Sequence, residues 1–188
     1  MSIAILSATG HRRMPWKNGR GVTTEIAVHP QGAGLADFGW RVSMAAVDED
    51  GDFSIFPGID RSLAVLSGDG IALSIQDEPP QLLGPGGAPL SFPADVPVSA
   101  RLPGRPITDL NVMTRRGHFW HSLARVDQAE DLPGADWRLV LATEATRLQL
   151  GAEALALGPL DAVLCQGQDA LSRLSATAPV WLIRIGQI

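Results

Sequence analysis

The stretch Met14-Pro15-Trp16-Lys17-Asn18-Gly19-Arg20-Gly21-Val22-Thr23-Thr24-Glu25-Ile26 places three ligand-type side chains before a glycine-spaced turn and a strand-like run. Trp16 offers a flat apolar face with one N–H donor, and Asn18 offers both a donor and an acceptor. Gly19 and Gly21 allow positive φ and a close approach of the backbone to another group. The stretch fits one wall of a site for a small, planar, partly charged ligand. A lysine-bearing hairpin turn beside a core tryptophan is the alternative.

Glycine and proline divide the rest of the chain into short pieces. The chain holds 20 glycines and 14 prolines, a pattern typical of short strands joined by tight turns. Apolar and polar residues alternate along several pieces, as expected for strands with one buried face. We therefore predict an all-β chain with little helix and with strands in residues 22–28, 40–47, 62–66, 70–75, 107–114, 137–142 and 180–185.

Four segments need a separate interpretation. Ser67-Gly68-Asp69 predicts a hairpin between the strands at 62–66 and 70–75. Residues 143–157 are rich in alanine and leucine, but Gly151 and the local alternation favour two strands over a helix. Residues 120–129 fit a short helix without a firm apolar stripe. Residues 77–89 form a long connection or contain a very short edge strand.

Composition limits the class of protein. Hydrophobic residues make up 45% of the 188 residues, enough for a core. The net charge is −5 and no basic run occurs, so no nucleic-acid partner is expected. Cys165 is the single cysteine, which suits a reducing compartment. The N-terminal residues do not read as a signal peptide, and no segment approaches the ~20 apolar residues of a membrane helix. We expect a soluble cytoplasmic protein without membrane contact.

Two further stretches accompany the first one. Residues 53–70 read FSIFPGIDRSLAVLSGDG, and residues 108–117 read TDLNVMTRRG. With Trp16–Ile26, their order and separation resemble the HutD/Ves family of cupin-like proteins over most of the chain. The family usually has glycine where this chain has Arg20, which adds a charge near the first loop.

The resemblance implies a cupin-like (RmlC-like) β-barrel fold with two modules in one chain, a bicupin. A polar break with Pro133-Gly134 places the module boundary near residues 117–135. We assign residues 1–120 and 121–188 to two modules packed as one compact unit. Many cupins bind a metal through histidines and a glutamate, but residues 53–61, at the corresponding place, contain no histidine. No metal or other cofactor is therefore expected.

One histidine pair offers an alternative metal site. His118 and His121 have i,i+3 spacing, which brings two side chains to one face only on a helix. On a strand they point to opposite faces, and they are then two partly exposed histidines beside a turn.

Polar residues on predicted strands supply the candidate ligand site. Asp109 and Asn111 share a strand face, and such residues are exposed, mutually hydrogen-bonded or directed into a cavity. Inward residues of a barrel converge on its axis. The predicted site comprises Trp16, Lys17, Asn18, Glu25, Ser43, Arg61, Asp109 and Asn111.

Each of these residue types suits one part of a small ligand. Arg61 would clamp a carboxylate, Glu25 or Asp109 would receive an N–H, and Trp16 would stack on a planar group. The alternative is that Arg61 forms a structural ion pair with Asp109 or Asp60.

The resemblance also implies a role. The family is associated with histidine utilisation, where its members look regulatory, so we expect a sensor or buffer without catalytic residues. Urocanate, formiminoglutamate and formylglutamate are the expected ligands because each carries a carboxylate. One alternative is a metal-independent isomerase or hydrolase that uses Glu25 and Asp109 as acid and base. Another is a dimerising interaction module without a ligand, in which the chain forms a homodimer.

Overall fold

The computed structural model describes residues 2–16, 21–132, 134–167 and 173–188, and these residues are almost entirely β-structure. Their single helix, η1 (Ala8–Gly10), has three residues, and no helix there is long and apolar enough to cross a bilayer. The strands are β1 (Ser2–Leu6), β2 (Arg12–Pro15), β3 (Gly21–His29), β4 (Trp40–Val47), β5 (Gly51–Asp52), β6 (Ile59–Ser67), β7 (Ile71–Ile75), β8 (Gln81–Leu83), β9 (Leu90–Pro93), β10 (Val98–Arg101), β11 (Ile107–Arg115), β12 (Phe119–Val126), β13 (Glu130–Asp131), β14 (Trp137–Ala142), β15 (Thr146–Leu150), β16 (Glu153–Leu157), β17 (Ala162–Gln166), β18 (Arg173–Ala176) and β19 (Val180–Gln187).

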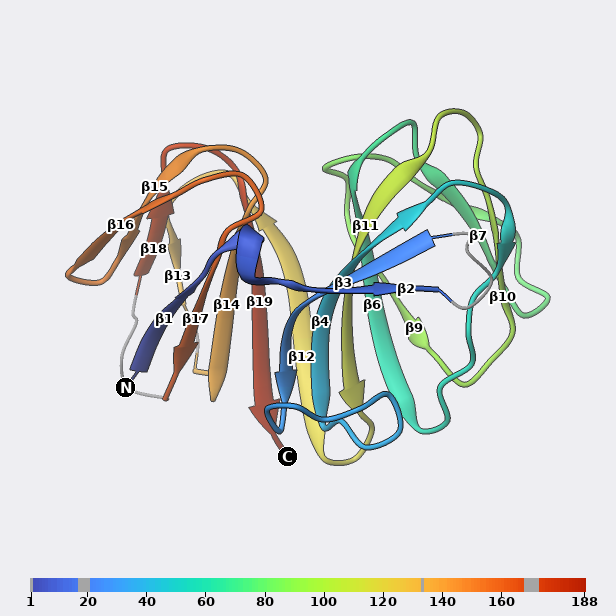
Figure 1. The fold of residues 1–188 in the computed structure, drawn as a ribbon, viewed down its shortest axis with the longest axis horizontal. Helices are drawn as coiled ribbons and strands as arrows, with labels where there is room; N and C mark the ends of the chain where they lie inside the picture. Colours follow the sequence, from blue (N-terminus) through green and yellow to red (C-terminus); the bar gives the residue numbers. More distant parts are fainter. Residues whose placement is uncertain (1, 17–20, 133, 168–172) are drawn as a thin grey trace. The chain divides into compact units, whose positions relative to one another are not determined.

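The chain divides into two compact units, which we call module I and module II. Module I is Arg12–Phe119, and module II combines the N-terminal segment up to His11 with Trp120–Ile188. The expected division at residue 120 differs from this grouping at the N-terminus. The reason is that β1 pairs with β17 along its whole length, from Ser2 opposite Gln166 to Leu6 opposite Ala162. Figure 1 shows β1 beside β17.

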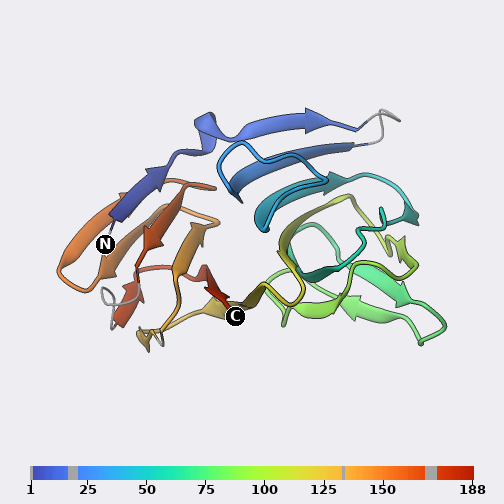
Figure 2. The same cartoon turned by 90° about the horizontal axis from the view of Figure 1, so that it is seen from below.

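Module I contains two antiparallel sheets. A six-stranded sheet has the order β2-β3-β4-β11-β6-β9, and a four-stranded sheet has the order β5-β10-β7-β8. Apolar side chains from both sheets form one core, which includes Leu63 and Val65 from the first sheet and Ile71, Leu73 and Val98 from the second. Figure 2 shows the strands of module I curving around a common interior.

The predicted hairpin between residues 62–66 and 70–75 is wrong, although both strands exist. β6 belongs to the six-stranded sheet, whereas β7 pairs with β8 and β10 in the other sheet. The turn between them therefore carries the chain from one sheet to the other. Gly68 in this turn has φ +97°, and a Cβ there would collide with the Pro106 carbonyl oxygen, so the turn requires glycine.

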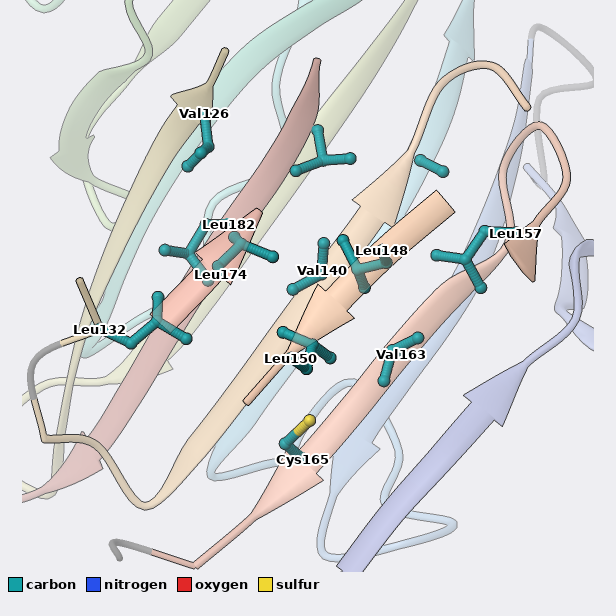
Figure 3. Packing of buried hydrophobic residues seen from close by; sticks show 12 residues of the cluster. Val126, Leu132, Val140, Leu148, Leu150, Leu157, Val163, Cys165, Leu174 and Leu182 are labelled. Atoms are coloured by element: carbon teal, nitrogen blue, oxygen red, sulfur yellow. The ribbon is translucent and has the colours of Figure 1, made fainter. Parts of the chain in front are cut away.

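Module II also contains two antiparallel sheets. Their orders are β1-β17-β14-β19-β12 and β13-β18-β15-β16. Figure 3 shows the apolar side chains between them, among them Val140, Leu148, Val163 and Leu182. The predicted two strands around Gly151 are confirmed as β15 and β16. The short helix considered for residues 120–129 does not form, because β12 occupies most of that segment.

Candidate ligand site

Strand register brings the predicted polar residues onto one face of the six-stranded sheet. Asn111 on β11 lies opposite Ser43 on β4, and Ser43 lies opposite Glu25 on β3. Directly opposite residues of antiparallel strands point to the same side. Asp109 lies two residues before Asn111 and therefore shares its face. This side faces the module interior, since Leu63, opposite Asn111 on β6, belongs to the core.

A β-bulge in β3 changes the alternation expected from the sequence. The register shifts between Glu25 and Ala27, so that Val28 lies opposite Arg41 while Glu25 lies opposite Ser43. Val28 therefore shares the interior face with Glu25, although strict alternation from residue 22 places them on opposite faces. The bulge inserts one extra residue on this strand, and Val28 packs against the buried cluster that includes Met113.

Arg61 lies on the same interior face and is surrounded mostly by apolar side chains. It is opposite Met113 on β11 and Phe92 on β9, and only 6% of it is exposed. Its Cζ lies 5.3 Å from the ring centroids of Phe53 and Phe56 and 5.9 Å from that of Phe92. Three aromatic rings therefore surround the guanidinium and hold it by cation–π contacts.

The buried guanidinium of Arg61 has few hydrogen-bond acceptors to offset the loss of its hydration. Its Nη2 donates to Met113 Sδ at 3.8 Å, and Nε has no partner among the described residues. Burial lowers the pKa of Arg61 to about 10, while the charge of Asp109 opposes this shift and the charge of Arg41 adds to it. Arg61 thus keeps its positive charge at neutral pH. It is a buried cation with unused donors.

Asp109 and Asn111 form a hydrogen-bonded pair beside Arg61. Asn111 Nδ2 donates to Asp109 Oδ1 at 2.7 Å, and the Ala45 N–H donates to the same oxygen at 3.1 Å. Burial raises the pKa of Asp109 to about 7, against the opposing effects of the Arg61 charge and these two hydrogen bonds. The hydrogen bonds of this pair within the described residues use neither the second oxygen of Asp109 nor the amide oxygen of Asn111. Asp109 changes charge near neutral pH.

Glu25 has a partner that sequence reasoning missed. Arg41 Nε donates to Glu25 Oε2 at 2.7 Å, and both side chains are buried. The interpretation that Glu25 freely accepts a ligand N–H therefore needs correction, because one of its oxygens is already held. The signal was present in the alternation of residues 40–47, which places Arg41 on the face of Ser43. The strand pattern could not show which acid it meets.

The first stretch of the sequence contributes Trp16 to the same core. Its indole Nε1 donates to Thr23 Oγ1 at 2.8 Å, and its ring packs against the interior cluster that includes Leu63 and Phe92. The ring also covers Gly21, where a Cβ would meet it at 2.9 Å. Lys17 and Asn18, which were also predicted for the site, lie outside the described residues.

The alternative ion pairs of Arg61 do not form among the described residues. Asp60 instead accepts a hydrogen bond from Arg116 Nε at 2.7 Å, and Arg116 also pairs with Asp95 at 2.9 Å. Asp109 influences Arg61 through its charge without a direct salt bridge. The buried arginine is therefore not explained as half of a structural pair.

The described residues contain no cluster of three histidine, cysteine or acidic side chains that could hold a metal ion. His118 lies in the turn before β12, and His121 lies within β12, so the helix that would have aligned them is missing. Module II carries a shallow hollow of about 610 Å³ lined by residues of β15, β16 and β18 and by Thr177. It is lined by Arg147, Gln149, Ser175 and Thr177 together with two leucines and three alanines, and no buried charge contributes to it.

Known proteins resemble this chain over its whole length. The sequence model of the family described as HutD matches residues 8–182. An uncharacterized 21.2 kDa protein in the hutC 3' region of Pseudomonas putida is 33% identical over 186 residues, or 97% of each chain. HutD from Pseudomonas fluorescens SBW25, solved in a formate condition, superposes with a TM-score of 0.87, 34% identity and full coverage of both chains. A cupin 2 conserved barrel domain protein from Leptotrichia buccalis shares the fold, with a TM-score of 0.58, 9% identity and coverage of 94% and 96%.

Proposed function

Because the chain belongs to the HutD family, we propose that it binds a small carboxylate-bearing compound of histidine utilisation in the interior of module I. The resemblance stated from the sequence and the cupin-like all-β fold are both confirmed by these relatives. A relative lies in a hutC region, which supports the link to histidine utilisation. We further propose that binding serves regulation, with the protein acting as a sensor or buffer of the compound.

The buried guanidinium of Arg61 carries the proposal. A buried cation costs free energy unless it is paired and hydrogen-bonded. Arg61 has no carboxylate partner among the described residues and leaves Nε without an acceptor. A ligand carboxylate would supply both the missing charge and two parallel hydrogen bonds. The surrounding rings of Phe53, Phe56 and Phe92 would exclude water and strengthen this pair.

Asn111 and Asp109, beside Arg61, would form hydrogen bonds with the end of the ligand that is distant from its carboxylate. The amide oxygen of Asn111 and the second oxygen of Asp109 accept hydrogen bonds, so they suit an imidazole, formimino or formamide N–H. Urocanate, formiminoglutamate and formylglutamate each combine such a group with a carboxylate. They are therefore our candidate ligands, and the site needs no metal to orient them.

The ion pair between Arg41 and Glu25 favours binding over catalysis. The alternative acid–base enzyme needs both Glu25 and Asp109 to exchange protons with a substrate. Glu25 is instead held at 2.7 Å by a buried arginine, which fixes the orientation of its carboxyl group. Incubation with each candidate compound would reveal turnover, and we expect the compounds to be recovered unchanged.

A thermal-shift panel tests the proposal. The protein is melted with each candidate compound, with and without a chelator, as wild type and as Arg61→Met, Asn111→Ala and Arg101→Gln. Arg101 is the matched control because it lies exposed at the end of β10 in the same module. A ligand at 100 times its Kd stabilises the folded state by about 2.7 kcal/mol, which corresponds to a rise of several degrees.

We expect the chelator to have no effect and Arg101→Gln to behave as wild type. Arg61→Met and Asn111→Ala should melt without a ligand-dependent rise. A rise of full size in both variants would place the ligand elsewhere.

A further inference from the structure

The guanidinium of Arg61 is covered by side chains of its own module. Only 6% of the residue is exposed, and the rings of Phe53, Phe56 and Phe92 lie against its guanidinium. The proposed ligand carboxylate needs the donors of this group. At least one of the covering side chains therefore has to move before the ligand binds.

The apolar neighbours of Arg61 are attached to the module in two different ways. Phe92 lies on β9 and Met113 on β11, and both strands pair with β6. Moving either of them would break the hydrogen bonds of the sheet. Phe53 and Phe56 instead belong to the connection between β5 and β6, outside any strand, and both are half-buried. They form the outer cover of the guanidinium.

Residues 53–58, which carry these two rings, have few hydrogen bonds to the rest of module I. The N–H groups of Phe53 and Phe56 donate to the carbonyl oxygens of Val98 and Ala94, each at 2.8 Å. The two residues between the phenylalanines are exposed and have no backbone hydrogen bond within the described part of the chain. A segment with so few attachments opens locally at a lower free energy than paired strands do.

Arg116 fastens this segment at Gly58. The Arg116 N–H donates to the Gly58 carbonyl oxygen at 2.9 Å, and the Gly58 N–H donates to Asp95 Oδ2 at 3.2 Å. The guanidinium of Arg116 donates to the two oxygens of Asp95 at 2.9 and 3.0 Å, and to Asp60 at 2.7 Å. The hydrogen bonds from Arg116 and Gly58 lower the pKa of Asp95 to about 2, so this ion pair is intact at neutral pH.

We propose that residues 53–58 form a lid over the Arg61 site and that Arg116 is the positioning residue that keeps the lid closed. This inference rests on the proposed function, since the lid would control the entry of that ligand. Opening lifts the two rings from the guanidinium and exposes its donors. Closing over a bound carboxylate excludes water and strengthens the ion pair. Arg116 acts through the Gly58 end of the segment and does not touch the ligand.

Thiol labelling of the ligand-free protein tests the lid. Arg61→Cys places a thiol beneath the lid, and methyl methanethiosulfonate modifies this thiol when the lid opens. Cys165, the single native cysteine, is buried, so its labelling rate is that of a thiol that only unfolding exposes. Peptide mass spectrometry separates the two positions. Adding Arg116→Gln should accelerate labelling at position 61 about fivefold, the effect expected from loss of an exposed ion-pair network.

Arg105→Gln is the matched control because Arg105 forms an exposed ion pair with Asp69 in the same module. In the Arg61→Cys background it should leave the labelling rate unchanged. Arg116→Lys keeps the charge but not the planar fork of donors, so it should label at an intermediate rate. If Arg61→Cys folds poorly, amide hydrogen exchange of Phe53 and Phe56 in proteins that keep Arg61 gives the same comparison.

Equal labelling rates in the Arg116→Gln and Arg105→Gln variants would overturn the lid. A labelling rate that rises steeply in low concentrations of urea would also overturn it, because that dependence marks unfolding of the whole module. The labelling needs no ligand, so its result is separate from that of the thermal-shift panel. Compounds that bind while the two rates stay equal would contradict the lid alone. Unequal rates without binding of any compound would contradict the proposed function alone.

Discussion

At the scale of single residues, two buried arginines of module I have opposite consequences for stability. Arg41 is paired with Glu25 at 2.7 Å, so Arg41→Met leaves a buried carboxylate alone and should cost about 3–5 kcal/mol. Arg61 has no such partner among the described residues, so Arg61→Met removes an uncompensated charge and should leave the free protein within about 1 kcal/mol of wild type or more stable. Urea unfolding of both variants without ligand measures the contrast. An equally large loss of unfolding free energy in both variants would mean that Arg61 stabilises the fold and is not held in place for a ligand.

Asp109 makes stability depend on pH. Its pKa is raised from 3.8 to about 7 in the folded protein. Between these two pH values the carboxyl group is protonated in the folded state and ionised in the unfolded state. Stability from this group is fully present below about pH 4 and declines as pH rises to about 7. Asp109→Asn keeps the shape of the side chain and removes the titration. Above pH 7 it should be more stable than wild type, by a few kcal/mol at most.

Urea unfolding of the wild type and Asp109→Asn at a series of pH values measures this difference. Two curves that stay parallel from pH 4 to pH 8 would contradict the assignment. Ligand affinity adds a second readout, because an ionised Asp109 opposes a bound carboxylate. Binding in the wild type should weaken as pH rises through about 7, and this dependence should be smaller in the asparagine variant.

At the scale of elements, the turn between β6 and β7 joins the two sheets of module I. Gly68 has positive φ, and its missing side chain makes room for the Pro106 carbonyl oxygen and for Ile107. Gly68→Ala should therefore destabilise the protein by about 1–3 kcal/mol through backbone strain and displacement of that loop. Gly51→Ala is the control because a Cβ at Gly51 meets nothing within 4 Å. Chemical unfolding compares the two, and equal effects would refute the account of the turn.

At the scale of the whole molecule, the N-terminal strand is part of module II. Asp161 accepts hydrogen bonds from the N–H groups of Ala8 at 2.8 Å and Gly158 at 2.9 Å, and these bonds lower the pKa of its carboxyl. Asp161→Ala removes both acceptors, so amide hydrogen exchange in β1 and β17 should accelerate while that of β11 in module I stays unchanged. Asp127→Ala, which removes an exposed partner of Arg125, is the control. Equal acceleration in β11 would contradict this division of the chain.

Alternation along the sequence determined the all-β class, most of the strands and the face that several of the site residues occupy. Asp109 and Asn111 were correctly placed on one strand face, because side-chain direction in a strand depends only on a local period of two residues. The alternation thus predicted which residues share a face, and their role in a ligand site stays a prediction. Composition and turn residues likewise placed the break between β15 and β16 at Gly151.

Only the tertiary structure decided which strands pair and which side chains meet. It separated β6 from β7 into different sheets, joined β1 to β17, inserted the bulge after Glu25, and brought Arg41 to that acid while Arg61 received aromatic rings. Pairing across a sheet depends on contacts between residues that are distant in the chain, and a local period carries no record of them. The partner of each buried charge therefore follows from register and packing, and those determine which arginine is left for a ligand.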